Sequence, residues 1–180
     1  MAAAAAFIAW LAITGGHGSS PRASVAAGSA ASSRSTAPIP GSPVVFDESA
    51  LKARVHTLRQ PVFWAGPEQK RRYEFRRANG NVFVRYLPAG VRPGAAADQF
   101  LMIATYPYPD ANAAAMKAIK DSPSLRYREV PNGGLAVVDP DAPTSVFLTF
   151  PGLDYQIEIF SPSPTRARDV AVSGRVKAIG

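Results

Sequence analysis

Hydrophobic and polar residues alternate most clearly over residues 73–87, on both sides of Asn79-Gly80. Alternating residues point to opposite faces of a β-strand. An Asn-Gly pair favours a two-residue type I′ loop, because both loop positions need positive φ. The pattern therefore predicts an antiparallel hairpin whose register places Glu74 opposite Arg85.

The two faces of this expected hairpin differ in character. One face is apolar and is expected to pack on the core; it carries Tyr73, Phe75, Val82, Val84 and Tyr86. The other face is richer in charge and is expected to point outward; it carries Arg72, Glu74, Arg76, Phe83, Arg85 and Leu87. A slip of one residue would exchange the faces and bury the arginines, so the register is well specified.

Other short apolar runs, bounded by proline and glycine, predict further strands. They lie at residues 62–64, 100–106, 125–130, 135–138, 144–150, 155–160 and 175–179. The residues 125–130 read as an edge strand because they carry several charges. In the run 155–160, Tyr155, Ile157 and Ile159 share one face, so Glu158 is expected to point outward.

Three short helices are expected between these strands. Asp47, Asp110 and Ser163 precede their first turns and are suitable N-cap residues. The expected helices extend to about residues 58, 120 and 173. The order of elements predicts an α+β fold: a mainly antiparallel sheet of about six to eight strands with two or three short helices packed on one of its faces.

The first 43 residues have a different composition from the rest. Residues 2–13 form an unbroken apolar run, too short for a typical membrane-spanning helix of about 20 residues. The run fits a signal peptide or a short membrane anchor at residues 1–14, although no Lys or Arg precedes it. A buried Ala-rich helix is the less favoured alternative. Residues 15–43 are rich in Ala, Ser, Gly and Pro and are expected to be a disordered linker, which leaves 44–180 as a single domain.

Charge and cysteine content narrow the choice of partners. The chain has a formal net charge of +7 and no cysteine. From residue 44 onward it carries 18 basic and 13 acidic residues, a modest surplus that suits an anionic membrane surface or anionic wall polymers. The absence of cysteine excludes disulfides, thiolate catalysis, cysteine-ligated zinc and lipid attachment through an N-terminal cysteine.

Catalytic motifs give little support for an enzyme. The chain has no phosphate-binding loop, dinucleotide-fold or nucleophile-elbow motif. Of the two histidines, His17 lies in the expected linker. Asp139 and Asp141 could bind a hard cation, but capping of a turn is the favoured interpretation. We therefore predict no catalytic residue, no metal site and no cofactor, and keep as an alternative a hydrolase assembled from dispersed residues such as Asp110, Tyr106 and His56.

Two surfaces are candidate binding sites. Arg72, Arg76 and Arg85 would form an outward basic row for anionic polymers or lipid headgroups, although a merely solvated sheet face is the favoured alternative. Trp64, Tyr106, Tyr108 and Asp110 could line a ligand groove, although core packing is the commoner fate of such aromatic residues. Nucleic acid is not an expected partner, because the aromatic residues between the arginines are predicted to face inward.

Five segments of the expected domain carry a resemblance to known sequences: QPVFWAGP, GNVFVRYLPAGV, ATYPYPDA, GGLAVVD and YQIEIFSPSP. They resemble an uncharacterised family of exported or lipid-anchored proteins of high-GC Gram-positive bacteria. The resemblance implies export and a single domain, and it supplies no activity and no catalytic residues. Together with the composition, it predicts an exported or membrane-tethered, non-enzymatic accessory or binding domain at the cell envelope, with a hydrolase or a structural spacer as alternatives.

Overall fold

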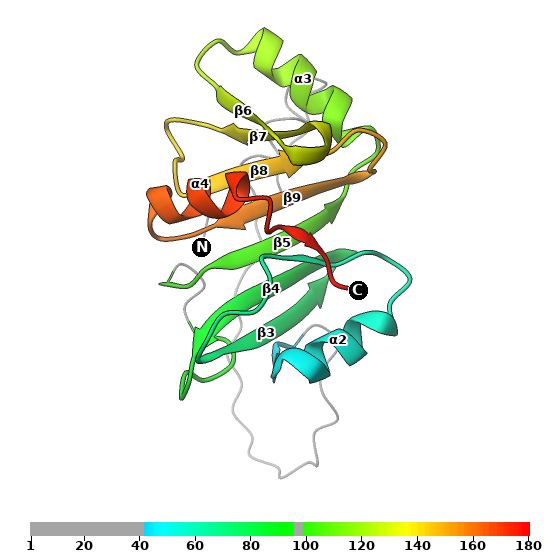
Figure 1. Ribbon diagram of the computed structural model, residues 1–180, viewed down its shortest axis with the longest axis vertical. Coiled ribbons are helices and arrows are strands. Elements are labelled where there is room, and N and C mark those ends of the chain that lie inside the picture. Colours follow the sequence, from blue (N-terminus) through cyan, green and yellow to red (C-terminus); the bar gives the residue numbers. More distant parts are fainter. Residues whose placement is uncertain (1–41, 96–98) are drawn as a thin grey trace, which may run out of the picture.

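Two antiparallel sheets and three α-helices make up the part of the chain that the computed structural model describes, residues 42–95 and 99–180 (Figure 1). The predicted α+β class is confirmed. The expected leader, and the expected linker up to residue 41, lie outside the described residues. Within those residues, no helix has both the length and the apolar character needed to cross a membrane.

The larger sheet has eight strands, each antiparallel to its neighbours. From one edge to the other its strands are β1 (Val44–Phe46), β3 (Arg71–Ala78), β4 (Asn81–Pro88), β5 (Met102–Pro107), β9 (Tyr155–Phe160), β8 (Ser145–Thr149), β7 (Gly134–Val138) and β6 (Arg126–Val130). The smaller sheet pairs β2 (Phe63–Trp64) with β10 (Lys177–Ala178). The helices are α2 (Glu48–His56), α3 (Ala111–Asp121) and α4 (Pro164–Val172), with a 3₁₀ turn, η2 (Pro131–Gly133), between β6 and β7.

The β3–β4 hairpin forms with the predicted register. Glu74 lies opposite Arg85. Asn79 and Gly80 have φ of +51° and +80°, as a type I′ loop requires. Local sequence therefore determined both the turn and the pairing of these strands.

Two of the three predicted helix caps form as expected. The Asp47 carboxylate accepts a hydrogen bond from the Ala50 N–H at 2.8 Å, and the Ser163 hydroxyl accepts one from the Arg166 N–H at 3.3 Å. Asp110 differs, because it adopts a left-handed conformation with φ of +53° and its side chain does not cap α3. The cap prediction for Asp110 was wrong: its backbone N–H instead donates to the Asp154 carboxylate at 3.1 Å.

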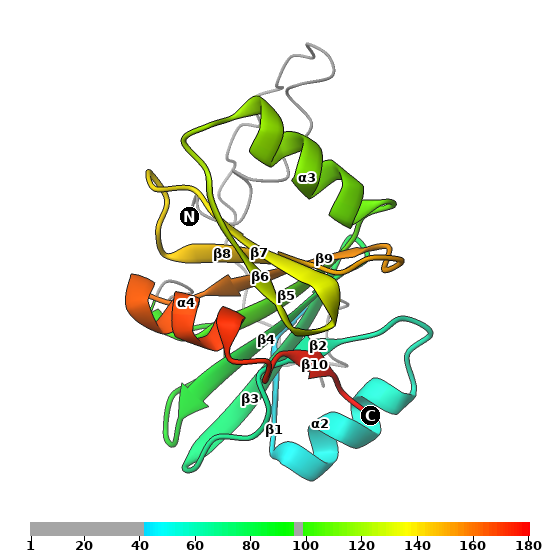
Figure 2. The ribbon, with the colours of Figure 1, turned by 45° about the horizontal axis from the view of Figure 1, so that its top comes forward.

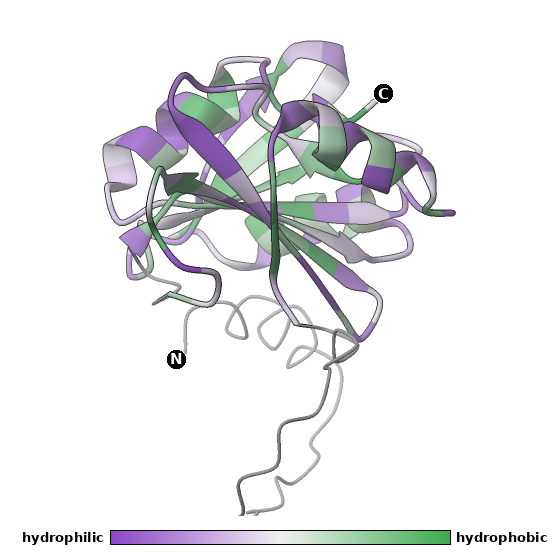
Figure 3. Ribbon diagram, turned by 90° about the horizontal axis from the view of Figure 1, so that it is seen from below, coloured by the Kyte–Doolittle hydropathy of each residue, from purple (hydrophilic) through white to green (hydrophobic). Residues whose placement is uncertain are grey.

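Helices cover both faces of the large sheet (Figure 2). The first face packs against α2, α4 and the small sheet, and it includes the predicted core residues of the hairpin. The second face packs against α3 through Leu135 and Val137, which alternate along β7 with the first-face residue Ala136. The expectation that all helices lie on one face was wrong, because β7 is apolar on both sides and requires cover on both. Figure 3 shows hydrophilic and hydrophobic residues along these strands and helices.

The second face of the hairpin is not an open basic surface. Arg72 and Arg76 are exposed, but Glu74 and Arg85 are buried. The chain that follows β4 folds back over them: the Gly94 N–H donates to Glu74 at 2.7 Å, and Arg85 donates to a backbone carbonyl of the same segment. The prediction that Arg85 is exposed was therefore wrong.

Candidate functional site

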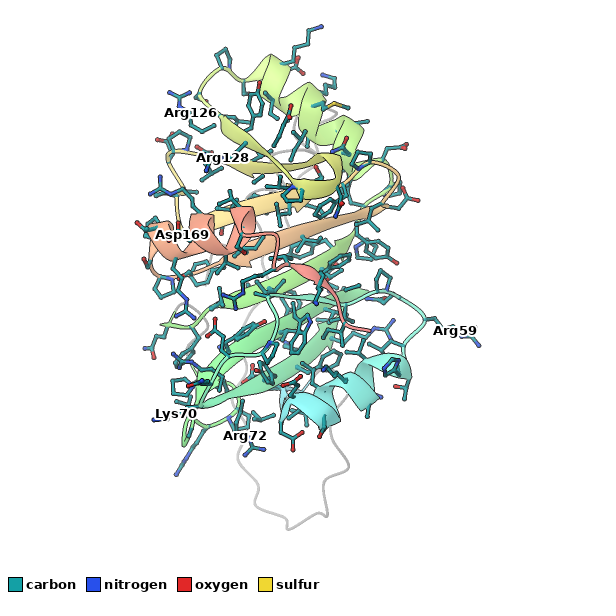
Figure 4. All side chains as sticks on the ribbon, viewed as in Figure 1. Arg59, Lys70, Arg72, Arg126, Arg128 and Asp169 are labelled. Carbon is teal, nitrogen blue, oxygen red and sulfur yellow. The ribbon has the colours of Figure 1, made fainter. Side chains whose placement is uncertain are left out.

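An open groove lies on the first face, between α4 and the edge strand β6. It encloses about 680 Å³. Figure 4 shows Arg126 and Arg128 on β6 and Asp169 on α4, all on the same side of the molecule. The lining residues are Arg126, Tyr127, Arg128, Ala136, Val138, Pro140, Pro143, Val146, Thr165, Arg168, Asp169 and Val172.

Strand alternation places two arginines at the groove. Arg126 and Arg128 are two residues apart, so their side chains leave β6 on the same side. Their partners across the strand pair are Val138 and Ala136, respectively. Opposed residues of an antiparallel pair share a face, so the groove has a guanidinium rim beside an apolar floor.

The opposite wall is one stripe of α4. Its groove residues are spaced three, four and seven positions after the first, which is the spacing of neighbours on one side of a helix; they are Thr165, Arg168, Asp169 and Val172. The other stripe of the helix is buried in the core; it carries Ala167, Val170 and Ala171. The amphipathic pattern of α4 thus fixes which of its polar side chains reach the groove.

The β7–β8 loop closes one end of the groove with Pro140 and Pro143. In this loop the Asp139 carboxylate accepts a hydrogen bond from the backbone N–H of Asp141 at 2.9 Å. This contact is the turn capping that the sequence favoured over a cation site. Within residues 42–95 and 99–180, no cluster of three or more His, Asp or Glu side chains is arranged to hold a metal ion.

The groove carries positive charge that its own residues do not neutralise. Three guanidinium groups face one carboxylate, which gives a formal charge of +2. Arg126 donates to the backbone carbonyls of Pro123 and Ser124 at 3.1 Å each. In the described part of the chain, Arg128 and Arg168 form no ion pair or hydrogen bond through their side chains. Both guanidinium groups are thus available to a ligand.

A second arginine cluster lies on the other side of α4, and its arginines, unlike Arg128 and Arg168, have an anionic partner. Its centre is the Glu68 carboxylate, which accepts two hydrogen bonds from Arg166 at 2.8 and 3.1 Å. Arg71 and Arg175 lie within 3.8 and 3.9 Å of the same carboxylate. This cluster links the β2–β3 loop, α4 and the C-terminal segment, and its arginines already have an anionic partner.

The predicted basic row is divided by the fold. Arg72 and Arg76 remain exposed, but Arg85 is 6% exposed and paired with Glu74. Figure 4 places Arg72 at the opposite end of the molecule from Arg126 and Arg128. The hairpin surface therefore has fewer available cations than the sequence indicated.

The predicted aromatic groove is not assembled. Trp64 packs on the first face, edge-on to Tyr73 with ring centres 5.6 Å apart. Tyr106 packs on the second face, edge-on to Phe83 at 6.0 Å. Tyr108 is half-buried in the loop that follows and Asp110 is exposed. For Trp64 and Tyr106, core packing is the interpretation that the structure supports.

The dispersed hydrolase site is not assembled either. His56 is exposed at the end of α2, a helix that packs on the first face of the sheet. Tyr106 belongs to the second face, where its hydroxyl donates to Glu158. The sheet thus separates two of the three residues that this alternative required.

Glu158 is a buried carboxyl on the second face, contrary to the expectation that it points outward. The Tyr106 hydroxyl donates to it at 2.6 Å and the Ser145 hydroxyl at 2.7 Å. Burial raises the pKa of Glu158 above its ordinary value, and the two hydrogen bonds oppose that rise only in part. Burial and the neighbouring carboxyl likewise raise the pKa of Tyr106.

The groove residues were missed by reasoning from the sequence, although part of their signal was visible. The edge strand and its charges at Arg126 and Arg128 were predicted correctly. The position of Arg168 beside them depends on how α4 crosses the sheet, which no local pattern specifies. The Arg-x-Arg pair on a predicted edge strand is the part of the signal that the sequence shows, and it does not indicate the groove without the position of α4.

Comparisons with family models, curated proteins and solved structures found no match for this chain. The resemblance to exported proteins of high-GC Gram-positive bacteria stays a prediction.

Proposed function

We propose that this protein is an exported or membrane-tethered, non-enzymatic binding module of the cell envelope, and that the α4–β6 groove holds an anionic ligand. The observation that carries the proposal is the pair of unpaired guanidinium groups of Arg128 and Arg168 above an apolar floor. Guanidinium groups bind carboxylates and phosphates through parallel hydrogen bonds. Export is supported by the apolar run at residues 2–13 and by the composition of residues 15–43.

Binding is favoured over hydrolysis by the chemistry of the groove. Its lining includes arginines, one carboxylate and a threonine hydroxyl, but no histidine, lysine or cysteine that could act as a base or an activated nucleophile. The groove has the concave shape and the mixed lining of a ligand site. A structural spacer would require neither.

The proposal is tested by co-sedimentation of the full chain with vesicles of phosphatidylglycerol, with vesicles of phosphatidylcholine, and with isolated cell walls, at low and high salt. The groove variant carries Arg126→Ser, Arg128→Ser and Arg168→Ser. A control variant removes the same charge from exposed arginines elsewhere, through Arg59→Ser, Arg72→Ser and Arg76→Ser. Because both variants keep residues 1–41, binding by the apolar run would be the same in each.

We expect binding to an anionic phase that weakens at high salt, is lost in the groove variant and is retained in the control. Equal loss of binding in both variants would mean that binding depends only on net charge, and would reject the groove as the binding site. Loss of binding in the control variant alone would place the binding site at the arginines that this variant changes, Arg59, Arg72 and Arg76.

A further inference from the structure

The floor of the α4–β6 groove is apolar. Recognition of an anion by the arginines alone does not require an apolar floor. Its aliphatic residues come from two strands and one helix: Ala136, Val138, Val146 and Val172. Pro140 and Pro143 extend this apolar surface at one end. Val138 and Val172 are only half-buried, so a polyanionic polymer that contacted the arginines alone would leave their apolar surface against water, which is unfavourable.

We infer that the occupant is a single-chain lipid with a phosphate head group, bound with its phosphate at the arginine rim and its alkyl chain along the floor. This inference rests on the proposed function and specifies its ligand. Groove and ligand match in charge: the groove has a formal charge of +2, and a phosphate monoester carries about −1.5 to −2 at neutral pH. They also match in the arrangement of polar and apolar parts: the cationic rim adjoins an aliphatic floor, as the phosphate of the lipid adjoins its alkyl chain.

The size of the groove favours one chain. Sites for single small molecules enclose about 300–1,000 Å³, and this groove encloses about 680 Å³. The arginines are exposed at its rim, whereas Ala136 and Val146 are buried beneath. A bilayer surface could reach the rim arginines but could not contact this floor, so the geometry points to a lipid monomer.

The test is calorimetric titration of the full chain with n-alkyl phosphates of four, six and eight carbons below their micelle concentrations. Inorganic phosphate serves as a head group without a chain, and octyltrimethylammonium as a chain with the opposite charge. If each methylene is fully buried, affinity should rise by about fourfold per carbon, which corresponds to about 0.8 kcal/mol. Octyltrimethylammonium should not bind in the groove.

Two kinds of variant separate the head group from the chain. Arg128→Ser should weaken every phosphate, including inorganic phosphate, and Arg59→Ser should weaken none. Val138→Ser should leave inorganic phosphate unchanged and reduce the gain in affinity per carbon. Thr165→Trp, at an exposed position of the wall, should obstruct the chain without altering the core, so the test does not depend on the stability of Val138→Ser.

The outcomes distinguish this inference from the proposed function. Phosphate binding that depends on Arg128 but not on chain length would overturn the lipid inference and leave the anion-binding module standing. A dependence on chain length that persists in both Val138→Ser and Thr165→Trp would place the alkyl chain outside the groove and also overturn it. Absence of any Arg128-dependent binding would overturn both proposals.

Discussion

Glu74 and Arg85 face each other across the β3–β4 hairpin and form an ion pair that is buried on both sides. Their side chains are 3% and 7% exposed. The Arg85 guanidinium donates to Glu74 at 2.8 Å and to the Ala95 carbonyl at 2.7 Å, and Glu74 accepts a further hydrogen bond from the Gly94 N–H. The pair therefore fastens the segment after β4 to the sheet.

Arg85→Ala should destabilise the domain by about 3–5 kcal/mol, because it leaves the Glu74 carboxylate buried without its cation. Urea denaturation measures this change in the free energy of unfolding. Arg76→Ser, at an exposed position of the same strand pair, should alter it by no more than about 0.5 kcal/mol. If Arg85→Ala is as mild as Arg76→Ser, the buried pair does not exist in solution.

Glu158 should make stability depend on pH. Its folded-state pKa is raised from an ordinary value near 4.5 by burial, so the folded state holds its proton more tightly than the unfolded state does. The stabilising contribution is therefore complete below about pH 4.5 and is lost as the pH rises through the folded pKa. The prediction is a fall in the free energy of unfolding over that interval.

Glu158→Gln provides the control for this effect, because an amide of similar shape does not titrate. The free energy of unfolding should depend less on pH in Glu158→Gln than in the parent chain, and the difference should appear on the alkaline side of pH 4.5. Parallel pH profiles for the two proteins would show that Glu158 does not titrate with folding.

Tyr86 satisfies two backbone groups with one hydroxyl. It accepts a hydrogen bond from the Ala65 N–H at 2.7 Å and donates to the Gly66 carbonyl at 3.1 Å. Tyr86→Phe should cost about 1–3 kcal/mol, because a buried donor and a buried acceptor lose their partner. Tyr127→Phe, whose parent side chain is 57% exposed, should have little effect on the same denaturation curve.

Gly80 tests the hairpin loop. An added Cβ would meet only Pro107, at 3.9 Å, so space does not limit substitution. The backbone conformation does limit substitution, because φ of Gly80 is +80°. Gly80→Val should therefore destabilise the domain by about 1–3 kcal/mol, and Gly80→Asn by clearly less, since Asn tolerates this conformation. An unchanged melting temperature in Gly80→Val would reject the type I′ loop.

Local patterns predicted the elements well and their surroundings poorly. The hairpin register, the Asp47 and Ser163 caps and the edge position of residues 126–130 all depend on neighbours in sequence, and all were predicted correctly. Arg85 and Glu158 were placed on the right face of their strands but were wrongly taken to be exposed. A strand pattern shows which residues share a face, and only the complete fold determines whether something covers that face.

The groove is the clearest case of this limit. Arg128 and Arg168 lie 40 positions apart in sequence, and their proximity follows from the packing of α4 across β9, β8 and the edge strand β6. Neither residue carries a motif. The candidate site could therefore be recognised only after α4 had been placed on the sheet.

A last prediction concerns Asp169 and the effect of its negative charge on the binding of an anion in the groove. It is the single carboxylate among the lining residues, and it lies on α4 next to Arg168. Asp169→Asn removes a charge that repels a bound anion, so affinity for octyl phosphate should rise by about two- to fivefold at low salt and less at high salt. The matched control is Asp121→Asn on α3, which packs on the other face of the sheet. If Asp169→Asn weakens the binding of octyl phosphate, repulsion by the carboxylate is not its dominant effect on the bound anion, and the predicted sign is wrong.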